Sequence, residues 1–163
     1  MTAARRRRWV PILAAAIAAL AVAALGGLMT DLGPWYYGLK QPAWKPPDWL
    51  FGPAWTLIYA CAALAGLAAW THAPDRAMRA QIVVLFAINA FLNILWSVLF
   101  FRMHRPDWAL GEVVLLWLSI VVLIVVLTPV SKTAGWLLVP YLAWVTFAAL
   151  LNLAVVRLNP PFT

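Results

Sequence analysis

Five long apolar runs, separated by short polar segments, account for most of the chain. Each run is close to the ~20 residues that an α-helix needs to cross the hydrocarbon core of a bilayer. The pattern predicts an all-α integral membrane protein, a bundle of five transmembrane helices that forms one domain over residues 1–163. The predicted spans are residues 9–30, 52–71, 80–101, 108–128 and 135–156.

The segment between the first two runs, residues 35–55, is rich in aromatic residues and proline. Proline fixes φ and lacks a backbone N–H donor, so this segment cannot form one continuous helix. Trp, Tyr and Phe supply rigid contact surface, and Lys40 and Lys45 add cationic tips. We predict a structured loop that carries flat side chains to one place and suits a flat, apolar, anionic ligand. The alternative is an aromatic belt at the membrane surface, where Trp and Tyr gather.

The first run follows the basic segment Arg5–Arg8 and has two interpretations. A basic stretch followed by an apolar one also occurs in cleavable signal peptides. The uncharged stretch from Trp9 to Thr30 exceeds the ~7–15 apolar residues of a signal peptide and is long enough to span a bilayer. We therefore favour a retained first helix.

Composition supports a membrane protein and argues against several other classes. The chain is 66% apolar and only 10% charged, whereas a soluble domain carries about 25% charged residues. The net charge of +7 comes mainly from residues at the ends of the apolar runs, so a nucleic-acid surface is not expected. The single Cys61 excludes an intramolecular disulfide. His72 and His104 have no Cys, Asp or Glu at ligand spacing, so no metal site is predicted.

The distribution of Lys and Arg predicts the orientation in the membrane. Basic residues accumulate on the cytoplasmic side, and the flank of the first helix usually dominates. A cytoplasmic N-terminus places Arg5–Arg8, Arg76, Arg79 and Lys132 inside. The aromatic loop and the C-terminus then lie outside, and the outside residues are Lys40, Lys45, Arg102, Arg105 and Arg157.

Aromatic and polar residues recur at helical spacing in three of the runs, so each run has one such face. We predict that these faces point inward to a cavity beneath the loop, and that Ala148 leaves space for a ligand one turn beyond Trp144. For each Asn the alternative is a hydrogen bond between helices that serves packing alone. The residues are Trp55 and Tyr59 in the second run, Asn89, Asn93 and Trp96 in the third, and Tyr141, Trp144, Ala148 and Asn152 in the fifth.

Residues for acid–base or nucleophilic chemistry are scarce in the runs. Glu112 is the only acidic residue that enters one, and we expect it near the surface, snorkelling or paired. A proton relay would need partners at depth, and the fourth run supplies only Ser119. No nucleophile–base pair is available, which excludes conventional hydrolysis.

Three segments of the sequence resemble the signature blocks of a known family. They are WYYGLKQPAWKPPDWLFGPAWTLIY, NAFLNILWSVLFF and VPYLAWVTFAALLN. Their order and spacing over residues 35–159 resemble the translocator proteins or tryptophan-rich sensory proteins, the TspO/MBR family, also known as peripheral-type benzodiazepine receptors. The resemblance implies a bundle of five helices, often a homodimer, in this case in a bacterial cell membrane. It also implies binding of protoporphyrin IX or haem, with no obligatory cofactor.

The resemblance also implies roles for particular residues. Tyr36 corresponds to a pocket tyrosine of the loop, and Trp55 and Trp144 to two pocket tryptophans. Asn89 and Asn93 correspond to polar pocket residues, and Ala148 to a small residue that governs the pocket. Tyr59 and Trp96 complete the predicted ligand-binding set. Sterol-binding members carry a Tyr where this chain reads LLNLAVVR, which argues against specific cholesterol binding here.

Three functions follow from these features. The first is a tetrapyrrole-binding sensor, carrier or scavenger. The second is light-dependent oxidative degradation of protoporphyrin, with Trp55 and Trp144 as the candidate participants and no firm catalytic residue. The third is a transporter of small molecules or sterols, against which the odd number of helices and the lack of an internal repeat argue.

Overall fold

A computed structural model describes residues 3–159 and 161–162 of the protein, with side chains from Trp9 onward. Every element in this part of the chain is helical, which confirms the predicted all-α class. The elements are α1 (Ala3–Met29), α2 (Pro34–Gly38), α3 (Asp48–His72), α4 (Arg76–Ser97), the π-helix η1 (Val98–Arg102), α5 (Pro106–Leu127) and α6 (Lys132–Leu158).

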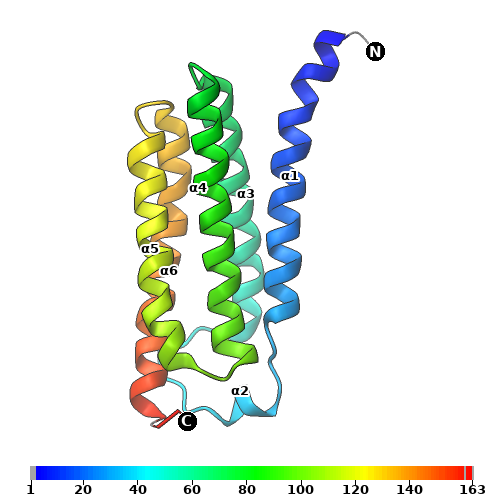
Figure 1. Cartoon of the computed structure of the whole chain (residues 1–163). Helices are drawn as coiled ribbons and strands as arrows, with labels where there is room; N and C mark the ends of the chain where they lie inside the picture. The colour runs from blue at the N-terminus through cyan, green and yellow to red at the C-terminus, as the bar shows by residue number, and fades with distance from the viewer. Residues whose placement is uncertain (1–2, 160, 163) are drawn as a thin grey trace.

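Five of these helices are long and apolar enough to cross a membrane, which confirms the predicted five-helix membrane fold. α6 packs against α3 and α5, α4 packs against α5, and α1 packs against α3 and α4, so the bundle closes as a ring. The two ends of the chain lie at opposite ends of the bundle (Figure 1). The loop with α2 lies across the end at which α6 finishes (Figure 1).

Polar caps set the starts of the later helices. The Asp75 side chain accepts a hydrogen bond of 2.8 Å from the Met78 amide at the start of α4. Ser131 caps α6 in the same way, and Pro106 occupies the first turn of α5, where its missing N–H costs nothing. Since their capped first turns are polar, α4 and α6 begin a few residues before the predicted apolar runs.

The start of α3 differs from the sequence prediction. A span that begins at Gly52 would have Pro53 in its first turn, but the helix begins at Asp48 and Pro53 lies in the second turn. Pro47 has extended backbone angles and ends the loop. Asp48 then places a negative charge at the helix N-terminus, where the helix dipole favours it.

The end of the third span also differs from a regular α-helix. α4 changes at Val98 into η1, which continues to Arg102. Successive residues of an α-helix point about 100° apart, so two adjacent residues seldom share one face. The wider π-turn buries both Phe100 and Phe101 at 5% and 9% exposure.

The most deeply buried residues belong to α3, α5 and α6, whereas α1 is the least buried of the spanning helices. Ala65 and Ala69 of α3 are fully buried, and such small residues let neighbouring helices approach closely. Ile120 and Leu123 of α5 are also fully buried. In α1, Gly26 is the one buried residue among those whose side chains are described.

The side of the membrane on which each end lies remains a prediction. It depends on Arg5–Arg8, whose side chains lie outside the described part, and on the Lys and Arg of the loops. A reporter fused after Thr163, which itself lies outside the described residues, should report a non-cytoplasmic location. The same reporter inserted beside Ser131 should report a cytoplasmic one. The reverse pattern would show that the aromatic loop faces the cytoplasm.

Candidate functional site

A cavity of about 590 Å³ lies inside the bundle, beneath the loop. α1, α3, α4, η1 and α6 supply its walls, and the loop supplies one end. The lining is mainly aromatic, a composition that suits a flat apolar ligand. The aromatic lining residues are Tyr36, Trp49, Phe51, Trp55, Tyr59, Trp96, Phe100, Phe101 and Trp144.

The structure brings together all but one of the residues predicted to bind ligand. The exception is Asn89. It lies one turn along α4 from Asn93, and Asn93 lines the cavity whereas Asn89 does not. Whether the lining residues contact a ligand remains a prediction. The predicted residues in the lining are Tyr36, Trp55, Tyr59, Asn93, Trp96, Trp144 and Ala148.

Two tryptophans form a corner of the cavity. The ring centroids of Trp55 and Trp144 are 6.5 Å apart and their planes meet at 86°. Trp55 also stacks on Tyr59 at 5.3 Å, and Phe51 meets Trp144 edge-on at 5.6 Å. Edge-to-face and stacked pairs are the favourable geometries for aromatic rings, so the corner is held in place without a ligand.

A chain of hydrogen bonds runs from the cavity wall into the bundle. Tyr59 donates to Asn93 at 2.9 Å, and Asn93 donates to the Tyr141 hydroxyl at 3.0 Å. Tyr141 donates to Asn89 at 3.1 Å, and Asn89 donates to Ser119 at 2.8 Å. Asn93 is therefore both a lining residue and a packing residue. Asn89 instead forms hydrogen bonds between helices, the packing role that was given as the alternative to ligand contact.

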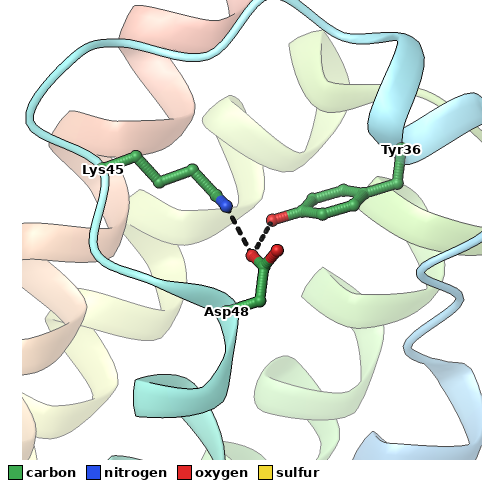
Figure 2. A network of polar contacts seen from close by, with 3 residues as sticks. All are labelled: Tyr36, Lys45 and Asp48. Atoms are coloured by element: carbon green, nitrogen blue, oxygen red, sulfur yellow. Dashed lines mark hydrogen bonds and ion pairs between the residues drawn. The ribbon is translucent and has the colours of Figure 1, made fainter.

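Three residues of the loop region form a polar network over the cavity (Figure 2). Asp48 accepts a hydrogen bond of 3.0 Å from the Tyr36 hydroxyl and forms an ion pair with Lys45. Burial raises the pKa of Tyr36 above its usual value, against the lowering effect of Lys45. Burial lowers the pKa of Lys45, but its bonds to Asp48 and Tyr36 outweigh burial and raise that pKa overall. Lys45 therefore stays charged, and it balances the carboxylate in the cavity lining.

The loop is fastened to the bundle at several points. The Lys40 amide donates to the Asn159 side chain at 2.7 Å, and Asn159 donates back to the Lys40 carbonyl at 2.8 Å. Trp35 stacks on His104 with centroids 4.1 Å apart. These contacts join the loop to the end of α6 and to the connection before α5. The loop is thus a folded cover, as its prolines predicted.

The aromatic residues of the loop do not all point to the cavity. Tyr36 is buried in the lining, but Tyr37 and Trp44 are more than half exposed. Trp49 borders the cavity and is 71% exposed. The loop thus contributes some of its aromatic rings to the cavity lining and leaves others exposed, and an aromatic belt at the membrane surface stays a prediction for the exposed ones.

Several lining residues were not predicted from sequence. Gln41 has a buried Nε2 with no hydrogen-bond partner among the described residues, so it can donate to a ligand oxygen. Gly26 and Gly27 of α1 line the cavity on that side without side chains that would fill it. Phe101 joins the lining through the π-turn, which the sequence pattern does not reveal. Asn152 belongs to the face of the fifth run that was predicted to point inward, and it does line the cavity, with an amide that fits hydrogen bonds to the start of α5. Tyr141 of the same predicted face does not line the cavity.

Glu112 contradicts its sequence expectation. Its side chain is buried at 6% exposure, and neither carboxyl oxygen has a hydrogen-bond partner in the described part of the chain. It does not line the cavity. No group of three His, Cys, Asp or Glu that could hold a metal ion occurs among the described residues.

These features define an integral membrane protein in which five helices and a folded loop enclose an aromatic cavity. Residues 14–158 match the TspO/MBR family, and the chain belongs to this family. The family resemblance seen in the sequence is thereby confirmed.

Relatives include microbial and mammalian proteins. The chain is 44% identical over 144 residues to the tryptophan-rich protein TspO of Chlorobaculum tepidum, covering 86% of this chain and 90% of the relative. It is 36% identical over 142 residues to protein CrtK of Rhodobacter capsulatus, covering 87% and 89%. It is 35% identical over 158 residues to the translocator protein of Sus scrofa, covering 93% and 91%.

Proposed function

We propose that the protein binds a tetrapyrrole, protoporphyrin IX or haem, in the cavity and acts as a sensor, carrier or scavenger. The observation that carries the proposal is the aromatic cavity of about 590 Å³, within the ~300–1,000 Å³ of small-molecule sites. A relative from Cereibacter sphaeroides is named a tryptophan-rich sensory protein, and the mammalian relatives are named translocator proteins. Those names are consistent with a sensor or a carrier.

The polar groups of the cavity suit a macrocycle with acidic substituents. Lys45 neutralises Asp48, so the lining does not repel an anion through an uncompensated carboxylate. The unpartnered Nε2 of Gln41 offers a donor to a carboxylate oxygen. The flat face of the ligand would pack against Trp55 and Trp144.

The lining favours stacking over coordination of iron. Protein ligands to haem iron are usually His, Cys, Met or Tyr. Among the described lining residues only Tyr36 and Tyr59 are of these types, and both hydroxyls donate to other side chains. We therefore expect metal-free protoporphyrin IX and haem to bind with similar affinity.

Titration of the purified protein with protoporphyrin IX in the dark tests the proposal. Saturable quenching of tryptophan fluorescence at one ligand per chain is the expected result. Haem and a porphyrin without carboxylates serve as comparisons for the metal and the acidic groups. Quenching that rises linearly with ligand, as in detergent alone, would rule out a specific site.

The corner of Trp55 and Trp144 also supports a second candidate function, light-dependent oxidation of bound protoporphyrin. This reaction needs molecular oxygen and an excited porphyrin beside an oxidisable indole. Trp55→Phe and Trp144→Phe should keep dark affinity within about tenfold, or ~1.4 kcal/mol, because phenyl rings preserve most of the stacking. The same changes should abolish light-driven loss of the bound porphyrin, measured by absorbance. Equal bleaching in wild type, both variants and free porphyrin would leave a binding protein without this activity.

A homodimer in the bilayer is part of the same proposal and rests on the family resemblance. Mass measurement of the detergent-solubilised chain, with and without protoporphyrin, tests it. The transport alternative is tested by flux of protoporphyrin across the membrane of reconstituted vesicles. Binding without flux would favour the sensor or scavenger role.

A further inference from the structure

A second hollow lies at the opposite end of the bundle from the loop. It is a shallow, open groove on the outer surface, where α3 ends and α4 begins. Its lining combines two arginines, one tryptophan and three small or branched apolar residues. These residues are Trp70, Arg76, Arg79, Ala80, Val83 and Val84.

The positive charge in the groove is available for a ligand. Arg76 and Arg79 are exposed, and neither forms an ion pair with an acidic residue of the described chain. The nearest acidic residue in sequence, Asp75, caps α4 through its bond to the Met78 amide. Arg79 lies over the Trp70 ring with its guanidinium carbon 5.3 Å from the ring centroid. That cation–π contact orients one guanidinium at the edge of the groove.

The apolar part of the groove lies deeper along α4. Val83 and Val84 are 56% and 54% exposed, on a helix that spans the membrane. They follow Arg76 by about two turns, or roughly 11 Å along the helix axis. Since the headgroup layer is about 5–7 Å thick on each side, a guanidinium among the headgroups places the valines beside acyl chains.

We propose that this groove binds one acidic phospholipid, with its phosphate on Arg76 and Arg79 and an acyl chain along Val83 and Val84. Guanidinium groups pair well with phosphate, and basic pockets between transmembrane helices are suited to anionic headgroups. Ala80 has a small side chain and leaves room between the charged and apolar parts. The site is distinct from the aromatic cavity, with which it shares no lining residue.

Native mass spectrometry of the full chain in detergent tests the site. The probes are phosphatidylglycerol and phosphatidylcholine with identical acyl chains. We expect a first phosphatidylglycerol to bind more tightly than phosphatidylcholine. Each Arg→Gln change should weaken phosphatidylglycerol binding about fivefold, and both together roughly 25–30-fold. Trp70→Leu should weaken it as well, because Arg79 loses its orienting contact.

Arg157→Gln is the matched control, since Arg157 is an exposed arginine at the other end of the bundle. It should leave the first binding event unchanged. Arg76→Lys with Arg79→Lys keeps the charge and should retain most of the preference, which separates loss of charge from loss of fold. Equal binding of the two lipids, or an equal loss in Arg157→Gln, would overturn the proposal. Displacement of the lipid by millimolar glycerol phosphate would also overturn it, because the site would then select a free phosphate.

Discussion

Replacement of Ala148 by leucine is expected to lower the affinity for protoporphyrin IX by about 10- to 100-fold. Ala148 lines the cavity one turn beyond Trp144. Leucine adds three carbon atoms to a wall that a bound macrocycle would contact. Overfilling a packed site costs ~1–3 kcal/mol, and each 1.4 kcal/mol is a factor of ten in affinity. Fluorescence titration in the dark measures the change.

Ala143→Leu is the matched control for this prediction. Ala143 lies on the same helix, is exposed and does not line the cavity. The same increase in volume there should leave affinity and thermal stability unchanged. Unchanged affinity in folded Ala148→Leu would place the ligand elsewhere. A large loss of thermal stability in Ala148→Leu alone would show that the alanine serves helix packing.

Replacement of Asn89 by leucine is expected to destabilise the bundle by about 1–2 kcal/mol without a change in porphyrin affinity. Asn89 accepts from Tyr141 and donates to Ser119, so the change removes two bonds between helices. Single interhelical hydrogen bonds in membrane proteins average about 0.6 kcal/mol, and an orphaned buried donor adds to the loss. The Tyr141 hydroxyl is the donor left without an acceptor. The free energy of unfolding in bicelles and the dark titration measure the two quantities.

The double variant Asn89→Leu with Tyr141→Phe tests the reason for the loss. Removal of the hydroxyl takes away the orphaned donor, so the double variant should lose less stability than the sum of the single changes. Strict additivity would show that the two side chains do not interact in the membrane. A drop in porphyrin affinity for Asn89→Leu as large as that for a substitution in the cavity lining, such as Ala148→Leu, would show that Asn89 belongs to the ligand site.

The sequence predicted the membrane helices well because each apolar run has the length of a bilayer. It also located much of the cavity, since a period of 3.6 residues puts Trp55, Asn93 and Trp144 on inward faces. The same period could not separate Asn89 from Asn93. They share a face, but Asn89 lies away from the cavity and bonds to Tyr141 and Ser119, neighbours that the periodicity of one helix does not reveal.

Other parts of the site have no signal in the periodicity. Gln41 belongs to an irregular loop, so no helical repeat indicates where it points. Asp48 is a first-turn residue whose partners, Tyr36 and Lys45, are set by the path of the loop. Phe101 enters the lining through a π-turn, and the sequence of η1 is as apolar as a regular helix would be.

The low burial of α1 bears on the order in which the helices assemble. α1 supplies Ala23, Gly26 and Gly27 to the cavity wall, yet it is the least buried of the spanning helices. The other four helices can pack before this wall is in place, so the cavity is completed when α1 docks. A ligand that binds only the complete cavity then stabilises the docked position of α1. At a free concentration of 100 times Kd, such a ligand would favour docked α1 by about 2.7 kcal/mol.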